Sequence, residues 1–142
     1  MCENAHLPTN EFSDLITPLP ASYARLCRNQ TQPGYCVVIS KAHVSEPFEL
    51  APADAAQFWA DVTVVGAAVN DAFHPRKIDY LVMGHRLPHL HCHVYTQYEW
   101  NDPFRLIDIS EGDTALAADA WAERIELLRA CVTTRLDEAR SS

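Results

Sequence analysis

Three histidines, His89, His91 and His93, are the residues of this chain whose type and spacing most clearly suggest chemistry. They alternate strictly with three apolar residues, Leu90, Cys92 and Val94. A period of two is the period of a β-strand. The pattern therefore predicts a strand with three imidazoles on one face and three apolar side chains on the other, and we take this stretch as the functional centre.

Two kinds of chemistry use three imidazoles on one strand. Neutral imidazoles can converge on a metal ion, usually together with a carboxylate or a fourth histidine. Alternatively, one neutral imidazole can attack phosphorus and form a phosphorylated histidine that a second acceptor resolves. The apolar face is expected to pack in the core, so Cys92 is interpreted as a packing residue with a raised thiol pKa. These residues alone leave both chemistries open.

The composition limits the partners of the protein. A chain of 142 residues with 48% apolar content suits a single soluble domain over residues 1–142. Its formal net charge of −8 argues against nucleic acid or an anionic membrane as a general partner. The five cysteines form no CxxC pair, and no apolar leader is present, so we expect reduced thiols and a cytoplasmic location.

Strands are predicted on either side of the histidine stretch and earlier in the chain. Residues 22–29 and 35–39 have strand character, and Pro33-Gly34 marks the turn of a hairpin between them. Residues 78–83 alternate and predict a further strand that ends at Gly84. Residues 1–20 are expected to be irregular, because prolines at positions 18 and 20 exclude a central strand.

Two helices are predicted, at residues 52–73 and 114–137, the second with Asp113 as its N-cap. The apolar stripe of the first comprises Phe58, Trp59, Val62, Val65, Val69 and Phe73. That of the second comprises Trp121, Ile125, Leu128, Val132 and Leu136. The order of elements predicts an α+β fold, an antiparallel sheet of about five strands with a central helix and a C-terminal helix on one side.

The stretch Pro88-His89-Leu90-His91-Cys92-His93-Val94-Tyr95 resembles the signature of the histidine triad (HIT) family. Flanking segments are similar to the branch of that family known as diadenosine-tetraphosphate-hydrolase-like. They are Pro33-Gly34-Tyr35-Cys36 leading into Lys41-Ala42-His43, the run from Tyr80 to Gly84, and Tyr98 through Asp102-Pro103. The resemblance covers about residues 22–104 and implies a HIT-like sheet.

The resemblance implies a nucleotide hydrolase or nucleotidyl transferase that acts at the α-phosphate of a nucleotide conjugate. Dinucleoside polyphosphates and nucleoside phosphoramidates are the expected substrate types, with a histidyl-nucleotide intermediate. By analogy with the family, His91 would be the nucleophile, His93 would lie beside the phosphate and His89 would orient the cluster. The resemblance also implies a homodimer and no metal or other cofactor at the triad.

Further positions are carried over from the family as substrate-binding residues. Leu26, Arg28 and Asn29 correspond to the base and ribose site. His85 stands where the branch usually has a phosphate-contacting asparagine. Asn29 replaces a common aspartate and Thr96-Gln97 a common Pro-Arg pair, which puts substrate identity in question. The other histidines, at positions 6, 43 and 74, are interpreted as structural or surface residues.

Two alternatives follow from the same residues. These departures from the family pattern would suit a nucleotide-binding protein with little or no catalytic activity. A cupin-like metalloprotein would also use a His-x-His strand, but four glycines and two predicted helices fit that all-β class poorly.

Overall fold

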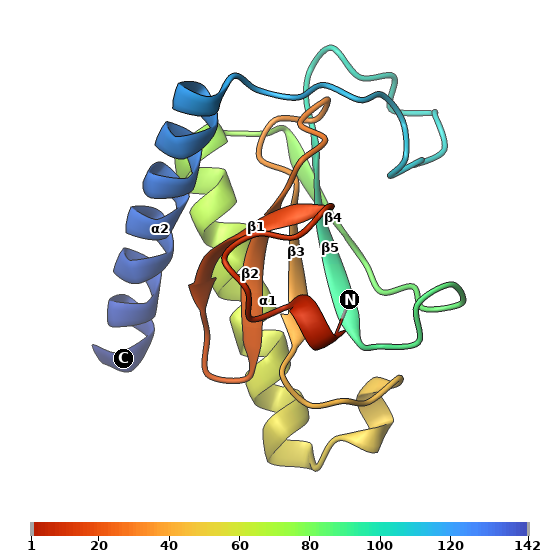
Figure 1. The fold of residues 1–142 in the computed structure, drawn as a ribbon, viewed down its shortest axis with the longest axis vertical. Coiled ribbons are helices and arrows are strands. Elements are labelled where there is room, and N and C mark those ends of the chain that lie inside the picture. The colour runs from red at the N-terminus through yellow and green to blue at the C-terminus, as the bar shows by residue number, and fades with distance from the viewer. Residues whose placement is uncertain (1, 142) are drawn as a thin grey trace.

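The computed structural model describes residues 2–141 and contains a five-stranded antiparallel sheet with two long helices, an α+β fold as predicted (Figure 1). The strands lie in the order β1-β2-β3-β5-β4. Their bounds are β1 Ser13–Pro18, β2 Ser22–Cys27, β3 Cys36–Ser40, β4 Lys77–Leu81 and β5 His91–Gln97. The helices are α1 Pro52–Phe73 and α2 Ala118–Ser141, with 3₁₀ turns η1 Cys2–Asn4 and η2 Pro47–Glu49.

The two helices cover one face of the sheet and enclose the main core. The predicted stripe of α2 packs into this core, and that of α1 does so except at Trp59, which is 39% exposed. Helix α1 has the predicted bounds: Pro52 occupies its first turn, and His74 ends it in the left-handed conformation. Gly66 in the middle of α1 is explained by β4, because a side chain there would collide with the Tyr80 hydroxyl.

The turn between β2 and β3 is held by one buried side chain. The Gln30 amide donates to the carbonyls of Cys27 and Tyr35 at 2.8 and 3.0 Å, and its oxygen accepts from the amide of Gly34 at 2.9 Å. Gly34 has φ +89° and lies against the Phe73 ring, so both its backbone and its surroundings require glycine. This turn fixes the start of β3, where Tyr35 lies.

The prediction that residues 1–20 are irregular was wrong for Ser13–Pro18, which form β1. Strand β1 is the edge strand beside β2, with one isolated bridge from Asp14 to Thr9 on its outer side, and an edge tolerates Pro18 because the outer side needs no continuous ladder of hydrogen bonds. The exclusion of a central strand there was correct.

The start of the last helix was also predicted wrongly, since α2 begins at Ala118 and Asp113 is not its N-cap. Residues 111–114 are instead bound to the β2–β3 turn. The Asn29 side-chain amide donates to the carbonyls of Glu111 and Gly112, both at 2.9 Å, and the amide of Gln30 donates to the Thr114 carbonyl at 2.8 Å. These long-range bonds keep the segment extended, and sequence periodicity could not reveal them.

The sheet separates the apolar and histidine residues of β5 onto opposite faces. Leu90, Cys92 and Val94 belong to the core beneath the helices. On the other face, Val37 and Ile39 of β3 pack with Ala5 of the N-terminal segment, which crosses this side of the sheet (Figure 1). Within residues 2–141, neither helix combines the length and apolar composition needed to cross a bilayer.

Candidate active site

The histidines of β5 lie on the face of the sheet opposite the helices. Antiparallel pairing places His91 opposite Ile39 and His93 opposite Val37 on β3. His89, predicted on the same strand, lies just before β5 in a bend. All three histidines are buried: His89 and His91 are 5% exposed and His93 is 8% exposed. The predicted histidine face therefore exists, but it is far more enclosed than an open strand face.

The main chain fixes the protonation pattern of the His91 ring. Its Nδ1 lies 2.6 Å from the carbonyl oxygen of His89. A carbonyl can only accept a hydrogen bond, so Nδ1 carries the proton and donates it. In a neutral ring the lone pair is then on Nε2, which has no hydrogen-bond partner within residues 2–141. In that neutral form His91 presents an unprotonated ring nitrogen, which is the requirement for a nucleophile.

His89 supports His91 through its backbone and is itself held by two neighbours. Its Nε2 donates to the Ser40 carbonyl at 2.7 Å, and its Nδ1 lies 3.3 Å from Nδ1 of His43. Burial lowers the pKa of His89, which favours the neutral ring. Neither nitrogen is then free for a ligand. The carbonyl of His89 is the group that orients His91.

His93 is paired with a residue that the sequence analysis did not single out as functional. The Tyr35 hydroxyl and His93 Nδ1 are 2.7 Å apart. Burial, and to a smaller extent His91, lowers the pKa of His93 to about 4, and burial raises the pKa of Tyr35 well above its usual value. Both groups are neutral at pH 7. When the hydroxyl donates to Nδ1, the remaining proton of His93 is on Nε2, on the same face as His91.

Four cysteines, at positions 27, 36, 92 and 131, are free thiols. Burial raises the pKa of Cys92 to about 11, and its side chain lies in the core. This agrees with its interpretation as a packing residue. In the part of the chain that the structure describes, no group of three histidine, cysteine, aspartate or glutamate side chains is arranged to hold a metal ion.

Two of the three positions carried over for base and ribose lie on the wrong side of the sheet. Leu26 is fully buried in the core with the helices, so its side chain cannot touch a ligand on the histidine face. Arg28 donates to Asp14 and to the Asn10 carbonyl, and its guanidinium lies over the Trp121 ring of α2. Side chains alternate along β2, and this alternation sends both toward the helices.

The positions at which the chain departs from the family pattern lie in three different environments. Asn29 is committed to the loop at residues 111–112, and its oxygen accepts from the Thr31 amide and hydroxyl. Thr96 points into the core side and donates to the Pro33 carbonyl at 2.9 Å. His85 is exposed in the connection between β4 and β5, and within residues 2–141 no hydrogen bond or ring contact joins it to the triad. Its role stays a prediction.

Tyr35 and His43 are the neighbours of the triad that sequence reasoning missed. Both were visible only as parts of flanking segments, Pro33-Gly34-Tyr35-Cys36 and Lys41-Ala42-His43. His43 was interpreted as structural or surface; its residue is exposed, yet its ring reaches His89 with centroids 5.4 Å apart. A tyrosine one residue before a buried strand has no periodic signal that separates it from an ordinary packing residue, so pairing between β3 and β5 was needed to find it.

Comparison with solved structures gives the same fold. A histidine triad protein from Bradyrhizobium japonicum has a TM-score of 0.78 and 19% identity, covering 86% of this chain and 92% of that one. A histidine triad (HIT) protein from Sinorhizobium meliloti 1021 has a TM-score of 0.73 and 20% identity, covering 92% and 98%. A hypothetical histidine triad nucleotide-binding protein from Sulfolobus tokodaii has a TM-score of 0.72 and 17% identity, covering 94% and 91%.

Sequence comparison adds the family. No curated protein matches the chain. The model of the HIT domain matches residues 9–100, which span β1 to β5 and include the whole triad with its supporting residues Tyr35, Ser40 and His43. This match identifies the family as a whole and no branch within it. The chain belongs to the HIT domain family.

Proposed function

We propose that the protein is a nucleotide hydrolase or nucleotidyl transferase that reacts through His91. HIT proteins are generally nucleotide hydrolases or transferases, which supports this class. The observation that carries the proposal is the hydrogen bond from His91 Nδ1 to the His89 carbonyl, because it holds the lone pair at Nε2. The similar structure from Sulfolobus tokodaii is described as nucleotide-binding, which agrees with the substrate class.

The reaction proposed for this geometry has two displacements at phosphorus. His91 Nε2 attacks the α-phosphate, a P–N bond forms, and the bond to the leaving group breaks with its electron pair on the leaving group. Water or another acceptor then attacks the same phosphorus, the P–N bond breaks, and His91 is regenerated. His93, with its proton on Nε2, donates a hydrogen bond to a phosphoryl oxygen, and Tyr35 holds that ring in place.

The substrate type proposed here is a dinucleoside polyphosphate or a nucleoside phosphoramidate. The flanking segments shared with the diadenosine-tetraphosphate-hydrolase-like branch support it. The test is turnover of diadenosine tetraphosphate and adenosine phosphoramidate by the wild type and by His91→Ala. We expect loss of the nucleophile to reduce kcat by about 10⁴-fold or more. His74→Asn is the matched control, because asparagine tolerates the left-handed conformation of that exposed histidine.

Mass spectrometry of the rapidly quenched reaction supplies an independent test. It should detect a nucleotidyl adduct on the peptide that contains His91 in the wild type and none in His91→Ala. Equal turnover by the two proteins would overturn the assignment of His91.

A nucleotide-binding protein with little or no turnover is the second candidate. The observation that favours it is the enclosure of the triad, whose three residues are at most 8% exposed. Saturable binding of adenosine monophosphate by isothermal titration, without adduct or turnover on either conjugate, would select this candidate over the enzyme.

A further inference from the structure

The N-terminal segment covers the face on which the proposed reaction takes place. Ala5 is 1% exposed and packs on Val37 and Ile39. These two residues are the cross-strand neighbours of His93 and His91. Residues 3–7, which we call the strap, therefore lie over the side of the histidine cluster toward β2. A nucleotide whose α-phosphate reaches His91 must extend away from the triad, and the strap occupies part of that space.

One side chain holds the strap. Arg25 of β2 is fully buried, and its Nη1 donates to the carbonyls of Ala5 and Leu7 at 2.7 and 2.6 Å. Its Nε and Nη2 donate to the hydroxyl and the carbonyl of Ser13 at 2.7 and 2.8 Å. Arg25 lies opposite Val37, which lies opposite His93, so the Cα atoms of Arg25 and His93 are on one transverse row, about 10 Å apart for two strand spacings.

The hydrogen bonds of Arg25 join the strap to a buried charge. All four go to neutral oxygens, and within residues 2–141 no carboxylate lies within ion-pair distance of the guanidinium, on which Asp14 acts only at longer range. Burying a charge without an ionic partner is costly, and two main-chain carbonyls of a terminal segment compensate it only while that segment stays closed. Water or the acceptor atoms of a ligand can therefore take the place of the two strap carbonyls as acceptors for Arg25.

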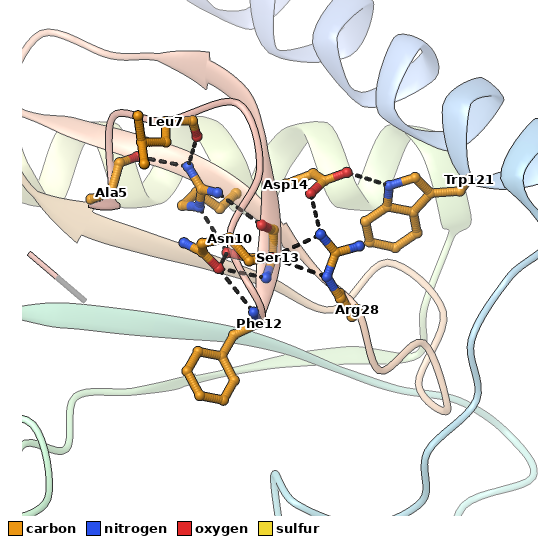
Figure 2. Close-up of polar contacts among 9 residues, drawn as sticks. Ala5, Leu7, Asn10, Phe12, Ser13, Asp14, Arg28 and Trp121 are labelled. Atoms are coloured by element: carbon orange, nitrogen blue, oxygen red, sulfur yellow. Dashed lines mark hydrogen bonds and ion pairs between the residues drawn. The ribbon is translucent and has the colours of Figure 1, made fainter. Parts of the chain in front are cut away.

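The strap is tied down much less firmly than the chain that follows it. Within residues 2–141, no main-chain hydrogen bond joins residues 3–7 to a strand. From Pro8 onward the chain is anchored, since the Pro8 carbonyl accepts from the Leu15 amide at 2.8 Å and the Asn10 carbonyl accepts from Arg28 at 2.8 Å. Figure 2 shows both parts, with Ala5 and Leu7 at one end of the cluster and Asp14, Arg28 and Trp121 at the other. The strap can therefore open about Pro8 while β1 stays in place.

We propose that the strap is an autoinhibitory segment latched by Arg25, and that it must open before a nucleotide reaches His91. The requirement that the strap open for a nucleotide rests on the proposed function, whereas closure of the histidine face by the strap does not. Opening costs the two latch hydrogen bonds and the burial of Ala5. The apparent dissociation constant of the nucleotide is then the intrinsic one divided by the open fraction.

The test is a full-length variant that opens the strap without touching the sheet. Ala5→Glu places a carboxylate where 1% exposure leaves no room for one. His6→Glu adds the same charge at the next position, which is exposed, and is the matched control. Arg25→Lys is the second variant, because an ammonium keeps the charge but cannot hold both carbonyls and Ser13. Circular dichroism verifies that each variant is folded.

Accessibility of the triad is measured with diethyl pyrocarbonate, and the modified histidines are located by peptide mass spectrometry. Exposed His74 is the internal reference. We expect modification of the peptide with His91 and His93 to be at least tenfold faster in Ala5→Glu than in the wild type, faster to a lesser degree in Arg25→Lys, and unchanged in His6→Glu. Equal modification rates in the wild type and in folded Ala5→Glu or Arg25→Lys would overturn the proposal that the strap closes the histidine face.

Binding of adenosine monophosphate separates this inference from the proposed function. We expect about tenfold tighter binding by Ala5→Glu than by the wild type and by His6→Glu. Faster histidine modification in Ala5→Glu, with no nucleotide binding by any of the proteins, would support closure by the strap and contradict the proposed function. Nucleotide binding that is equal in the wild type and Ala5→Glu would overturn the autoinhibitory role.

Discussion

Both faces of the sheet are largely buried from solvent, but for different physical reasons. Val38 and Val37 are neighbours on β3 and show the contrast. Val38 is fully buried against the helices, in a core of apolar side chains with many partners. Val37 is 6% exposed on the histidine face, and what covers it is a short terminal segment. The helix face is closed by an extensive apolar core, and the histidine face by a small apolar cluster together with a few directed hydrogen bonds.

This difference separates stability from chemistry within one sheet. Apolar packing is non-directional and spread over many contacts, so it tolerates no opening without global loss. On the histidine face each polar group depends on one or two partners, as with His91 on the His89 carbonyl and Arg25 on the strap carbonyls. Of these, Arg25 can exchange its strap carbonyls for acceptor atoms of a ligand, whereas the bond to the His89 carbonyl keeps the His91 ring oriented.

The sharpest way to test the contrast is to make the same substitution on each face. Val38→Ala removes two methyl groups from the core and should lower the free energy of unfolding by about 2–3 kcal/mol, including the cost of a cavity. Val37→Ala should cost only about 1 kcal/mol, because the strap above it can settle into the space. Urea unfolding of both variants checks this, and equal losses would contradict the distinction between the faces.

The pH dependence of stability should come in large part from the histidine face. An unfolded histidine binds a proton below about pH 6.5, whereas His93 in the fold does so only below about pH 4. Between these values the unfolded chain holds more protons. The contribution of His93 to the free energy of unfolding is therefore fully present above pH 6.5. It is lost as the pH drops toward 4, by an amount on the order of 1–3 kcal/mol. The lowered pKa of His89 acts in the same direction.

Urea unfolding at pH 7, 6 and 5 measures this dependence in the wild type and two variants. His93→Gln should flatten the profile, while His74→Asn should follow the wild type. A wild-type slope in His93→Gln would show that the stability loss arises elsewhere.

The smallest predicted effect concerns the positioning of His93. Tyr35→Phe removes the partner of His93 Nδ1 and should lower kcat by about tenfold, with a stability loss of about 1 kcal/mol. Tyr35→His should recover part of the rate, since it can again donate to Nδ1. A purely structural role would not change the imidazole tautomer, so nitrogen NMR of the ring gives the decisive readout. A wild-type tautomer and rate in Tyr35→Phe would remove Tyr35 from the site.

Prediction from the sequence succeeded where a local pattern had one structural solution. The bounds of α1 were correct, since Pro52 at the start and His74-Pro75 at the end are local signals. It failed at β1 and at the start of α2, where distant partners decide the conformation. Segment 111–114 is extended because Asn29 and Gln30 bind it, and those residues are more than 80 positions earlier.

Candidate site residues divide in the same way. Alternation alone placed His91 and His93 on one face and Cys92 in the core. Alternation applied to β2 also shows why the Leu26 and Arg28 side chains do not reach the histidine face. By contrast, Tyr35, Ser40 and His43 become neighbours of the triad only through the pairing and ends of β3, which residue spacing does not encode.

The sequence by itself therefore determined which residues form the candidate site, three histidines at strand spacing in a HIT domain. It could do so because side-chain direction along a strand follows from backbone geometry. Only the tertiary structure decided which ring nitrogen is free, which neighbours hold the rings, and that Ala5 packs on the β3 residues beside them while Arg25 binds the carbonyls of Ala5 and Leu7. These properties depend on contacts between segments far apart in the chain, and such contacts exist only once the sheet has formed.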